Sequence, residues 1–244
     1  MQPFRLALSF LTIIPAGISQ ELDARAFGKS IKYFPVVGLI IGLVLIGLNA
    51  IIPAQLPGLA ADMVLVIAVV IMTRSLHLDG LADTFDGLIG GRDKDHMLAI
   101  MKDSRVGSFG VVAIVAVIGL KLLLLSSVSA ELKLGALISF PVLGRWSACY
   151  AMVTQSYAGS NGGIGASFME EIGWRELLWS SVIALAITVL ILKSFAILIV
   201  SIAWVFTILY TKVVNSKIGG MTGDTLGALI ELTEVVVLFI VAVI

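Results

Sequence analysis

The chain has 244 residues, of which 59% are hydrophobic and only 13% are charged. This composition excludes a soluble globular domain and is typical of an integral membrane protein. Sixteen basic and sixteen acidic residues give a formal net charge of zero, so the bulk charge gives no indication of a nucleic-acid partner, and we expect none. A single cysteine, Cys149, excludes an internal disulfide, and one cysteine with two histidines argues against a zinc site.

Long apolar segments predict an all-α, polytopic bundle of about seven transmembrane helices. They lie at residues 34–52, 60–76, 108–128, 134–153, 177–192, 195–211 and 226–244. The third carries Lys121 and the fourth carries Pro141 and Arg145, so these two should face protein or water rather than lipid. We expect residues 1–244 to form a single integral-membrane domain, with an interfacial or re-entrant segment before the first span.

The lysine and arginine residues predict how the bundle is oriented. With the N-terminus in the cytoplasm, twelve of them fall on the cytoplasmic side and two, Lys133 and Lys193, on the other. This orientation also gathers the polar motifs on one side, although it was chosen from Lys and Arg alone. We therefore expect one active site at the cytoplasmic face of the membrane.

Three acidic residues follow the second apolar segment at offsets 0, 4 and 7: Asp79, Asp83 and Asp86. On a helix these offsets fall at about 0°, 40° and −20°, so the three carboxylates share one stripe. Carboxylates that converge repel one another, and a hard divalent cation such as Mg²⁺ offsets that repulsion. His77 precedes them and is a candidate base or hydrogen-bond donor, although a lone histidine is more often structural.

A polar loop after this acidic helix carries Arg92, Lys102, Ser104 and Arg105. Cations and hydroxyls beside a magnesium site indicate a phosphate-bearing substrate. The alternative is that these cations are ordinary charges of the cytoplasmic side.

A second polar motif, residues 219–228, contains a glycine turn followed by the last apolar segment. Gly220 and Thr222 are candidate phosphate-binding residues, because glycines before a helix let backbone N–H groups approach an anion. Asp224 and Glu231 lie seven residues apart on one helical face and are candidate metal ligands. For Glu231 and the following Glu234, the alternative is structural pairing with Arg145 or Lys121.

Together these features predict transfer of a phosphate-linked group at a membrane surface. A metal ion would neutralise a diphosphate, and a carboxylate or His77 would take the proton from an attacking alcohol. The residues alone do not choose among a phospholipid synthase, a membrane prenyltransferase and a rarer enzyme.

The order of the motifs resembles the cobalamin synthase family, the adenosylcobinamide-GDP ribazoletransferases. The resemblance runs along nearly the whole chain and rests on residues 33–38, 76–87, 101–110, 144–145, 163–165, 168, 219–224, 227–228, 231 and 234. The segments around the three aspartates and around Lys102-Asp103-Ser104-Arg105 are its most specific parts.

This resemblance implies a transferase of the bacterial inner membrane. The adenosylcobinamide-phosphate moiety of adenosylcobinamide-GDP would pass to the 5′-hydroxyl of α-ribazole, or of α-ribazole 5′-phosphate, giving adenosylcobalamin or its 5′-phosphate and GMP. Magnesium would be held by five acidic residues: Asp79, Asp83, Asp86, Asp224 and Glu231. Lys102 and Arg105 would hold the diphosphate, and Arg145 is among the phosphate-binding candidates. The resemblance leaves open a homo-oligomer or an association with other cobalamin-pathway enzymes.

Two other readings compete. A CDP-alcohol phosphatidyltransferase also uses spaced aspartates and Mg²⁺, but its pattern has an arginine after Asp-Gly-Ala, whereas here Asp79-Gly80 is followed by Leu81-Ala82-Asp83. An ion-coupled transporter would use Glu231 and Glu234 near the bilayer midplane between repeats, and no internal repeat is evident. Release of GMP or CMP distinguishes an enzyme from a transporter.

Overall fold

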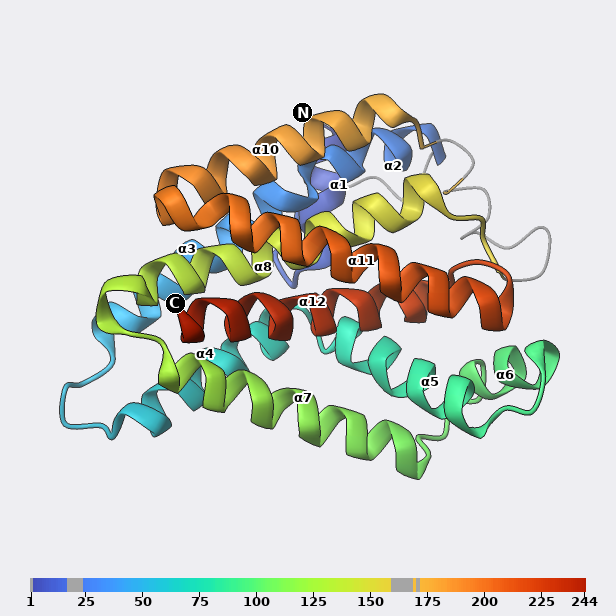
Figure 1. Cartoon of the computed structure of the whole chain (residues 1–244), viewed down its shortest axis with the longest axis horizontal. Helices are drawn as coiled ribbons and strands as arrows, with labels where there is room; N and C mark the ends of the chain where they lie inside the picture. The colour runs from blue at the N-terminus through green and yellow to red at the C-terminus, as the bar shows by residue number, and fades with distance from the viewer. Residues whose placement is uncertain (1, 17–23, 159–168, 170–171) are drawn as a thin grey trace.

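The computed structural model describes residues 2–16, 24–158, 169 and 172–244. In these residues the chain is helical, with one isolated β-bridge between Tyr157 and Met221 and no sheet. Residues 163–165 and 168, which contributed to the predicted motif pattern, lie outside the described residues. The helices, shown in Figure 1, are α1 (Gln2–Leu11), α2 (Ala24–Ser30), α3 (Phe34–Ile51), α4 (Gly58–Met72), α5 (Leu76–Gly90), α6 (Lys94–Met101), α7 (Ser108–Ser127), α8 (Ala130–Thr154), α10 (Trp174–Leu192), α11 (Ala196–Ile218) and α12 (Gly223–Val243), with short 3₁₀ turns η1 (Ile31–Tyr33) and η2 (Lys193–Phe195).

Among the described residues, five helical stretches are long and apolar enough to cross a membrane, and α4 with α5 makes up to six. The prediction of an all-α, multi-pass membrane protein is therefore confirmed. The count of five to six stretches treats 174–218 as one 45-residue stretch, where the sequence predicted two spans. Its halves α10 and α11 lie side by side in Figure 1, so the predicted division of this segment into two helices agrees with the structure.

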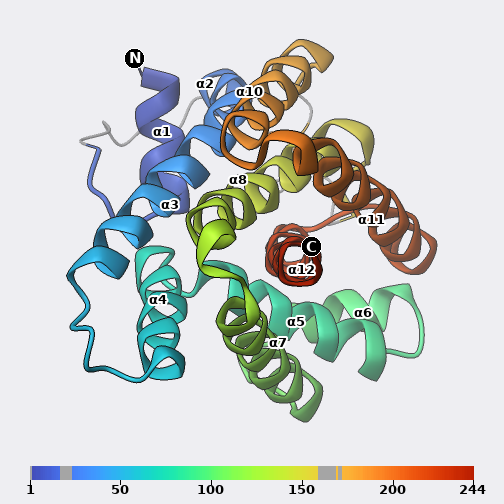
Figure 2. The same ribbon diagram turned by 60° about the vertical axis from the view of Figure 1, so that its left-hand side comes forward.

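Helices α8 and α12 form the centre of the bundle. Figure 2 shows α12 end-on, with α5, α7, α8 and α11 around it. Helix α3 packs closely against α8 at Gly42. A Cβ atom at this position would come within 2.8 Å of the Ile138 Cα. Small residues at such contacts let helix backbones approach closely inside a membrane.

Four charged side chains are buried where α7, α8 and α12 meet. Lys121 Nζ donates to Glu231 Oε2 at 2.6 Å and also to Glu234, and the Arg145 guanidinium pairs with the other oxygen of Glu234. Two cations and two anions make this group neutral, which lowers the cost of placing charge in an apolar interior. The predicted burial of Lys121 and Arg145 away from lipid is confirmed, and the predicted alternative of structural pairing for both glutamates matches these contacts.

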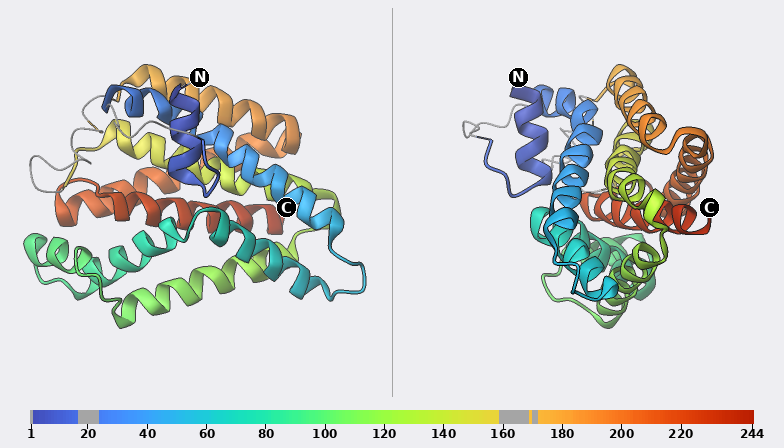
Figure 3. Two further views of the ribbon diagram at one scale, coloured as in Figure 1. Left: turned by 180° about the vertical axis from the view of Figure 1, so that it is seen from behind. Right: turned by 90° about the vertical axis from the view of Figure 1, so that its left-hand side faces the viewer.

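The N-terminal helix is fixed to the bend between α4 and α5, where the chain turns by 86°. Arg74 and Ser75 in this bend have positive φ angles of 53° and 56°. The Arg74 guanidinium donates to the carbonyl oxygens of Ser9 at 2.7 Å and Thr12 at 3.1 Å, and the Ile13 N–H donates to Met72 O at 2.7 Å. Figure 3 shows α1 on the outside of the bundle, steeply inclined to the long helices.

We predict that Glu234→Ala strongly destabilises the protein, because it leaves Arg145 and part of the Lys121 charge buried without a partner. Breaking a buried ion pair by removing one partner costs about 3–5 kcal/mol, so the unfolding temperature in detergent should fall by several degrees or more. Glu131→Gln, at an exposed glutamate in the first turn of α8, is the matched control and should unfold like the parent. An unchanged unfolding temperature for Glu234→Ala would show that the network contributes little.

Candidate functional site

The site is built on the contact between α5 and α12. A Cβ atom on Gly80 would lie 2.8 Å from the Asp224 carbonyl oxygen, and one on Gly227 would lie 3.3 Å from the His77 Cα. Each helix therefore presents a glycine where the other crosses it. This contact brings the acidic part of α5 beside the first turn of α12.

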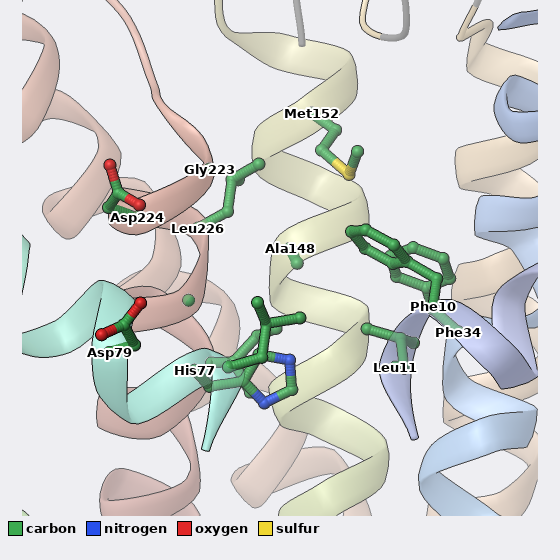
Figure 4. Close-up of a pocket in the computed structure, with 13 residues that line it drawn as sticks. Phe10, Leu11, Phe34, His77, Asp79, Ala148, Met152, Gly223, Asp224 and Leu226 are labelled. Atoms are coloured by element: carbon green, nitrogen blue, oxygen red, sulfur yellow. The ribbon is translucent and has the colours of Figure 1, made fainter. Parts of the chain in front are cut away.

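Three of the predicted carboxylates lie together at this contact. Asp79 is exposed, and Asp83 and Asp224 are half-buried. Their charges are close enough to repel: Asp83 interacts unfavourably with Asp224 and Asp79, and Asp224 with Asp79. Figure 4 shows Asp79 on α5 and Asp224 on α12 on the same side of the contact. Asp224 also lies in the first turn of α12, where the helix dipole favours a negative charge.

The chemistry of these carboxylates fits a magnesium ion whose remaining coordination positions are filled by substrate and water. In the described parts of the chain, no three His, Cys, Asp or Glu side chains are grouped closely enough to hold a metal ion by themselves. Mg²⁺ in phosphoryl-transfer sites is usually held by one or two carboxylates together with substrate phosphates and water. Mutually repelling hard oxygen donors beside an open surface suit that arrangement.

Asp86 and Glu231, two further candidate ligands, already have strong partners. Asp86 accepts the backbone N–H groups of Gly107 at 2.7 Å and Gly110 at 2.9 Å, so its carboxylate caps the N-terminus of α7. Glu231 is paired with Lys121 in the buried network. Sequence spacing placed Asp86 on the same stripe as Asp79 and Asp83, but spacing could not show which of the three would meet the start of another helix.

The cationic and hydroxyl candidates lie in the two loops that flank the short helix α6. Arg92, Lys102, Ser104 and Arg105 are all exposed. Arg105 forms an ion pair with Asp103 at 2.7 Å, and this guanidinium lowers the pKa of the Asp103 carboxyl to about 2. The Arg105 side chain is 87% exposed, so the pair is weak and leaves the guanidinium able to turn toward a phosphate.

The glycine turn before α12 is held by the segment that follows α8. The Ala158 N–H donates to Met221 O and the Met221 N–H donates to Ser156 O, both at 2.8 Å. Gly220 passes so close to Ser156 O that a side chain there would collide with it, while Gly219 has a φ of 76°. The predicted phosphate-binding role of Gly220 stays a prediction, and packing is a sufficient reason for its lack of a side chain.

Thr222 caps α12. Its hydroxyl accepts the Thr225 N–H at 3.2 Å, and the Thr225 hydroxyl accepts the Thr222 N–H at 2.7 Å. This reciprocal capping box satisfies donors at the helix start and fixes Asp224 in its first turn. The Thr222 hydroxyl thus has a structural role as an acceptor, and its predicted phosphate-binding role stays a prediction.

Comparison with known proteins identifies the family. The cobalamin-5-phosphate synthase family model matches residues 3–242. Adenosylcobinamide-GDP ribazoletransferase from Caldanaerobacter subterraneus subsp. tengcongensis is 40% identical over 95% of this chain and 94% of its own. The enzymes of the same name from Thermoanaerobacter pseudethanolicus and Fusobacterium nucleatum subsp. nucleatum are each 36% identical, over 96% and 100% of this chain and 94% and 98% of their own.

The chain belongs to the cobalamin-5-phosphate synthase family. The resemblance inferred from the sequence motifs is thereby confirmed, and the chain is a transferase of cobalamin biosynthesis. No solved structure matches it.

In this member of the cobalamin-5-phosphate synthase family, His77 and Arg145 lie inside the bundle. The His77 side chain is 2% exposed, and within the described residues neither ring nitrogen has a hydrogen-bond partner. It lines a cavity of about 170 Å³ that reaches Asp79 and Asp224 (Figure 4). Arg145 is fully buried and bound to Glu234, so its guanidinium lies in the core rather than with the exposed cations.

Sequence reasoning missed two groups of residues near the site. The apolar wall of the cavity includes Phe10 and Leu11, because α1 is drawn to the α4–α5 bend by contacts that no local pattern reveals. Lys94 is the other residue, and its Nζ lies 2.9 Å from the point where a Cβ on Gly219 would be. No local pattern links Lys94 to the glycine turn, which follows more than 120 positions later in the sequence.

We predict that Asp86→Ala lowers the unfolding temperature equally in magnesium and in EDTA, because it removes a helix cap. Loss of a side-chain cap costs about 0.5–2 kcal/mol, and Asp86→Asn, which keeps an acceptor oxygen, should recover part of it. Asp95→Ala, at an exposed acid in the first turn of α6, is the control. A loss of stability that appears only when magnesium is present would instead identify Asp86 as a metal ligand.

Proposed function

We propose that this chain is an adenosylcobinamide-GDP ribazoletransferase that assembles the nucleotide loop of cobalamin. It moves the adenosylcobinamide-phosphate moiety of adenosylcobinamide-GDP onto α-ribazole or α-ribazole 5′-phosphate and releases GMP. The family match over residues 3–242 carries this proposal, and the names of the relatives support it. The carboxylates gathered at the α5–α12 contact supply a site for such chemistry.

The reaction exchanges one phosphorus–oxygen bond for another. A ribose hydroxyl of the acceptor attacks the phosphorus that carries the cobinamide, the bond to the bridging oxygen breaks, and GMP leaves with that oxygen. The family description specifies a 5-phosphate on the product. An acceptor phosphorylated at the 5′ position has no free 5′-hydroxyl, so the attacking group is a secondary ribose hydroxyl rather than the 5′-hydroxyl expected from the sequence.

Asp79, Asp83 and Asp224 are the residues that would hold Mg²⁺. A magnesium ion there would supply positive charge to neutralise the diphosphate and the leaving phosphate. A carboxylate of this group or His77 accepts the proton of the attacking hydroxyl. Asp86 and Glu231 support the site indirectly, since their contacts fix the start of α7 and the middle of α12.

Lys102 and Arg105, with Arg92 and Ser104, bind the phosphates of the donor. Their exposure and their position after the acidic helix support this role, and Lys94 at the glycine turn extends the cationic surface. Flexible, exposed cations suit a large charged substrate that has to enter and leave. Arg145 is better explained as a support for α12, because its charge is already neutralised by Glu234.

The whole chain acts as one domain in the bacterial inner membrane, with its N-terminus and its active site on the cytoplasmic side. The excess of lysine and arginine in the loops on that side supports this orientation. The acidic and cationic motifs would then meet water-soluble nucleotides at the cytoplasmic surface.

We predict that Asp79→Ala, Asp83→Ala and Asp224→Ala each lower kcat by about 100-fold or more, because each removes a ligand of the metal that stabilises the leaving phosphate. The measurement follows GMP and cobalamin by chromatography, with the purified protein in nanodiscs across a magnesium series and in EDTA. The half-saturating magnesium concentration should rise in each variant that retains measurable activity. Asp95→Ala should behave like the parent. Full magnesium-dependent turnover in correctly folded Asp79, Asp83 and Asp224 variants would overturn the metal assignment.

We also predict that Lys102→Gln and Arg105→Gln raise the KM for adenosylcobinamide-GDP by about tenfold or more. A hydrogen bond to a charged group contributes roughly 1.5–3 kcal/mol, and the loss of that free energy corresponds to an increase in KM of about tenfold or more. Lys193→Gln, at an exposed lysine of η2, is the charge-matched control. Equal KM values in all variants would assign these cations to membrane orientation alone.

A further inference from the structure

The cavity beside the carboxylates has two chemically different ends. Phe10, Leu11, Phe34 and Met152 form an apolar wall, whereas Asp79 and Asp224 lie at the other end. Figure 4 shows the His77 ring between these two ends, on the side of the α5 ribbon that faces the phenylalanines. A ligand that fits has to be apolar at one end and hydroxylated or charged at the other.

The apolar end suits a flat aromatic group. The Phe10 and Phe34 rings are stacked, with centroids 6.2 Å apart and planes inclined by 24°, and Phe10 remains 43% exposed. The cavity measures about 170 Å³, and an apolar cavity of about 150 Å³ is enough to bind benzene. An aromatic ring of low polarity can therefore enter this end, whereas guanine would leave its carbonyl and amino groups without partners against this wall.

His77 supplies a second, independent indication of a ligand. Both ring nitrogens are buried and have no hydrogen-bond partner in the described part of the chain, although the ring borders the cavity. Buried polar groups in folded proteins are nearly always hydrogen-bonded. A nitrogen or hydroxyl of a bound nucleoside would provide the missing partner.

We propose that this cavity binds the aromatic base of the acceptor ribonucleoside, with the ribose directed toward Asp79 and Asp224. This inference rests on the proposed function, in which the acceptor is α-ribazole, a riboside of a benzimidazole. It adds to that function a binding site for the acceptor that is separate from the site of the donor diphosphate. The acceptor approaches from the α1–α3 side, and the diphosphate of the donor approaches from the side of α6.

Two substitutions test the cavity in the full-length protein in nanodiscs. Phe10→Ala removes a half-exposed ring and should raise the KM for α-ribazole about threefold to tenfold, as expected for one aromatic contact. Ala148→Leu, on the α8 wall, fills the cavity and should raise this KM more than tenfold. In both variants the KM for adenosylcobinamide-GDP should stay within about twofold of the parent.

The matched control is Phe239→Ala, which removes another exposed phenylalanine near the far end of α12. Both KM values should be unchanged in this variant. An increase in the donor KM alone, or no change in either KM for Phe10→Ala, would overturn the cavity assignment. Because Phe10 is half-exposed, this test remains decisive even if Ala148→Leu does not fold.

Direct binding separates this inference from the proposed function. If the parent protein forms no GMP, the proposed activity fails, and equilibrium dialysis with labelled α-ribazole then tests the cavity alone. Saturable binding that Phe10→Ala weakens and Phe239→Ala preserves supports the assignment. No saturable binding, or binding that Phe10→Ala leaves unchanged, overturns it.

Discussion

The close crossing of α5 and α12 is the constraint on which the site depends. Gly80 and Gly227 let the two backbones approach, and the approach places the acids of α5 beside Asp224. Helix α12 is itself fixed by its capping box at one end of the contact and by the Lys121–Glu234–Arg145 pairing further along. Carboxylates that repel one another therefore stay together, because packing elsewhere in the bundle holds their helices in place.

Charge is distributed in two ways that suit a membrane enzyme. Charges deep in the bundle are neutralised in pairs and serve the fold, as with Glu231 and Lys121. Charges at the α5–α12 contact are partly exposed, and within the described residues Asp79 and Asp83 have no ion-pair partner. The two sets have the same residue types but different surroundings, and only the second is available to the proposed metal ion and substrate.

Much of this arrangement could be predicted from the sequence. Apolar segments indicated the multi-pass helical fold, and the periodic spacing of Asp79 and Asp83 indicated a shared face. The sequence could not separate Asp86 from this pair, because its capping of α7 depends on a contact 21 to 24 residues away. Hydropathy predicted the apolar segment 60–76 but could not show that α4 bends sharply into α5. The part played by Phe10 depends on how α1 is held at the same bend.

The most direct test of this account is the magnesium dependence of GMP release by Gly80→Ala. A Cβ atom at Gly80 would press on the backbone of Asp224, whereas one at Gly47 in α3 meets nothing within 4 Å, so Gly47→Ala is the control. We expect Gly80→Ala to fold but to lose at least tenfold in kcat and to need more magnesium, because the added methyl group forces the acids of α5 away from Asp224. Parental turnover and an unchanged magnesium requirement in Gly80→Ala would contradict the claim that the α5–α12 crossing assembles the active site.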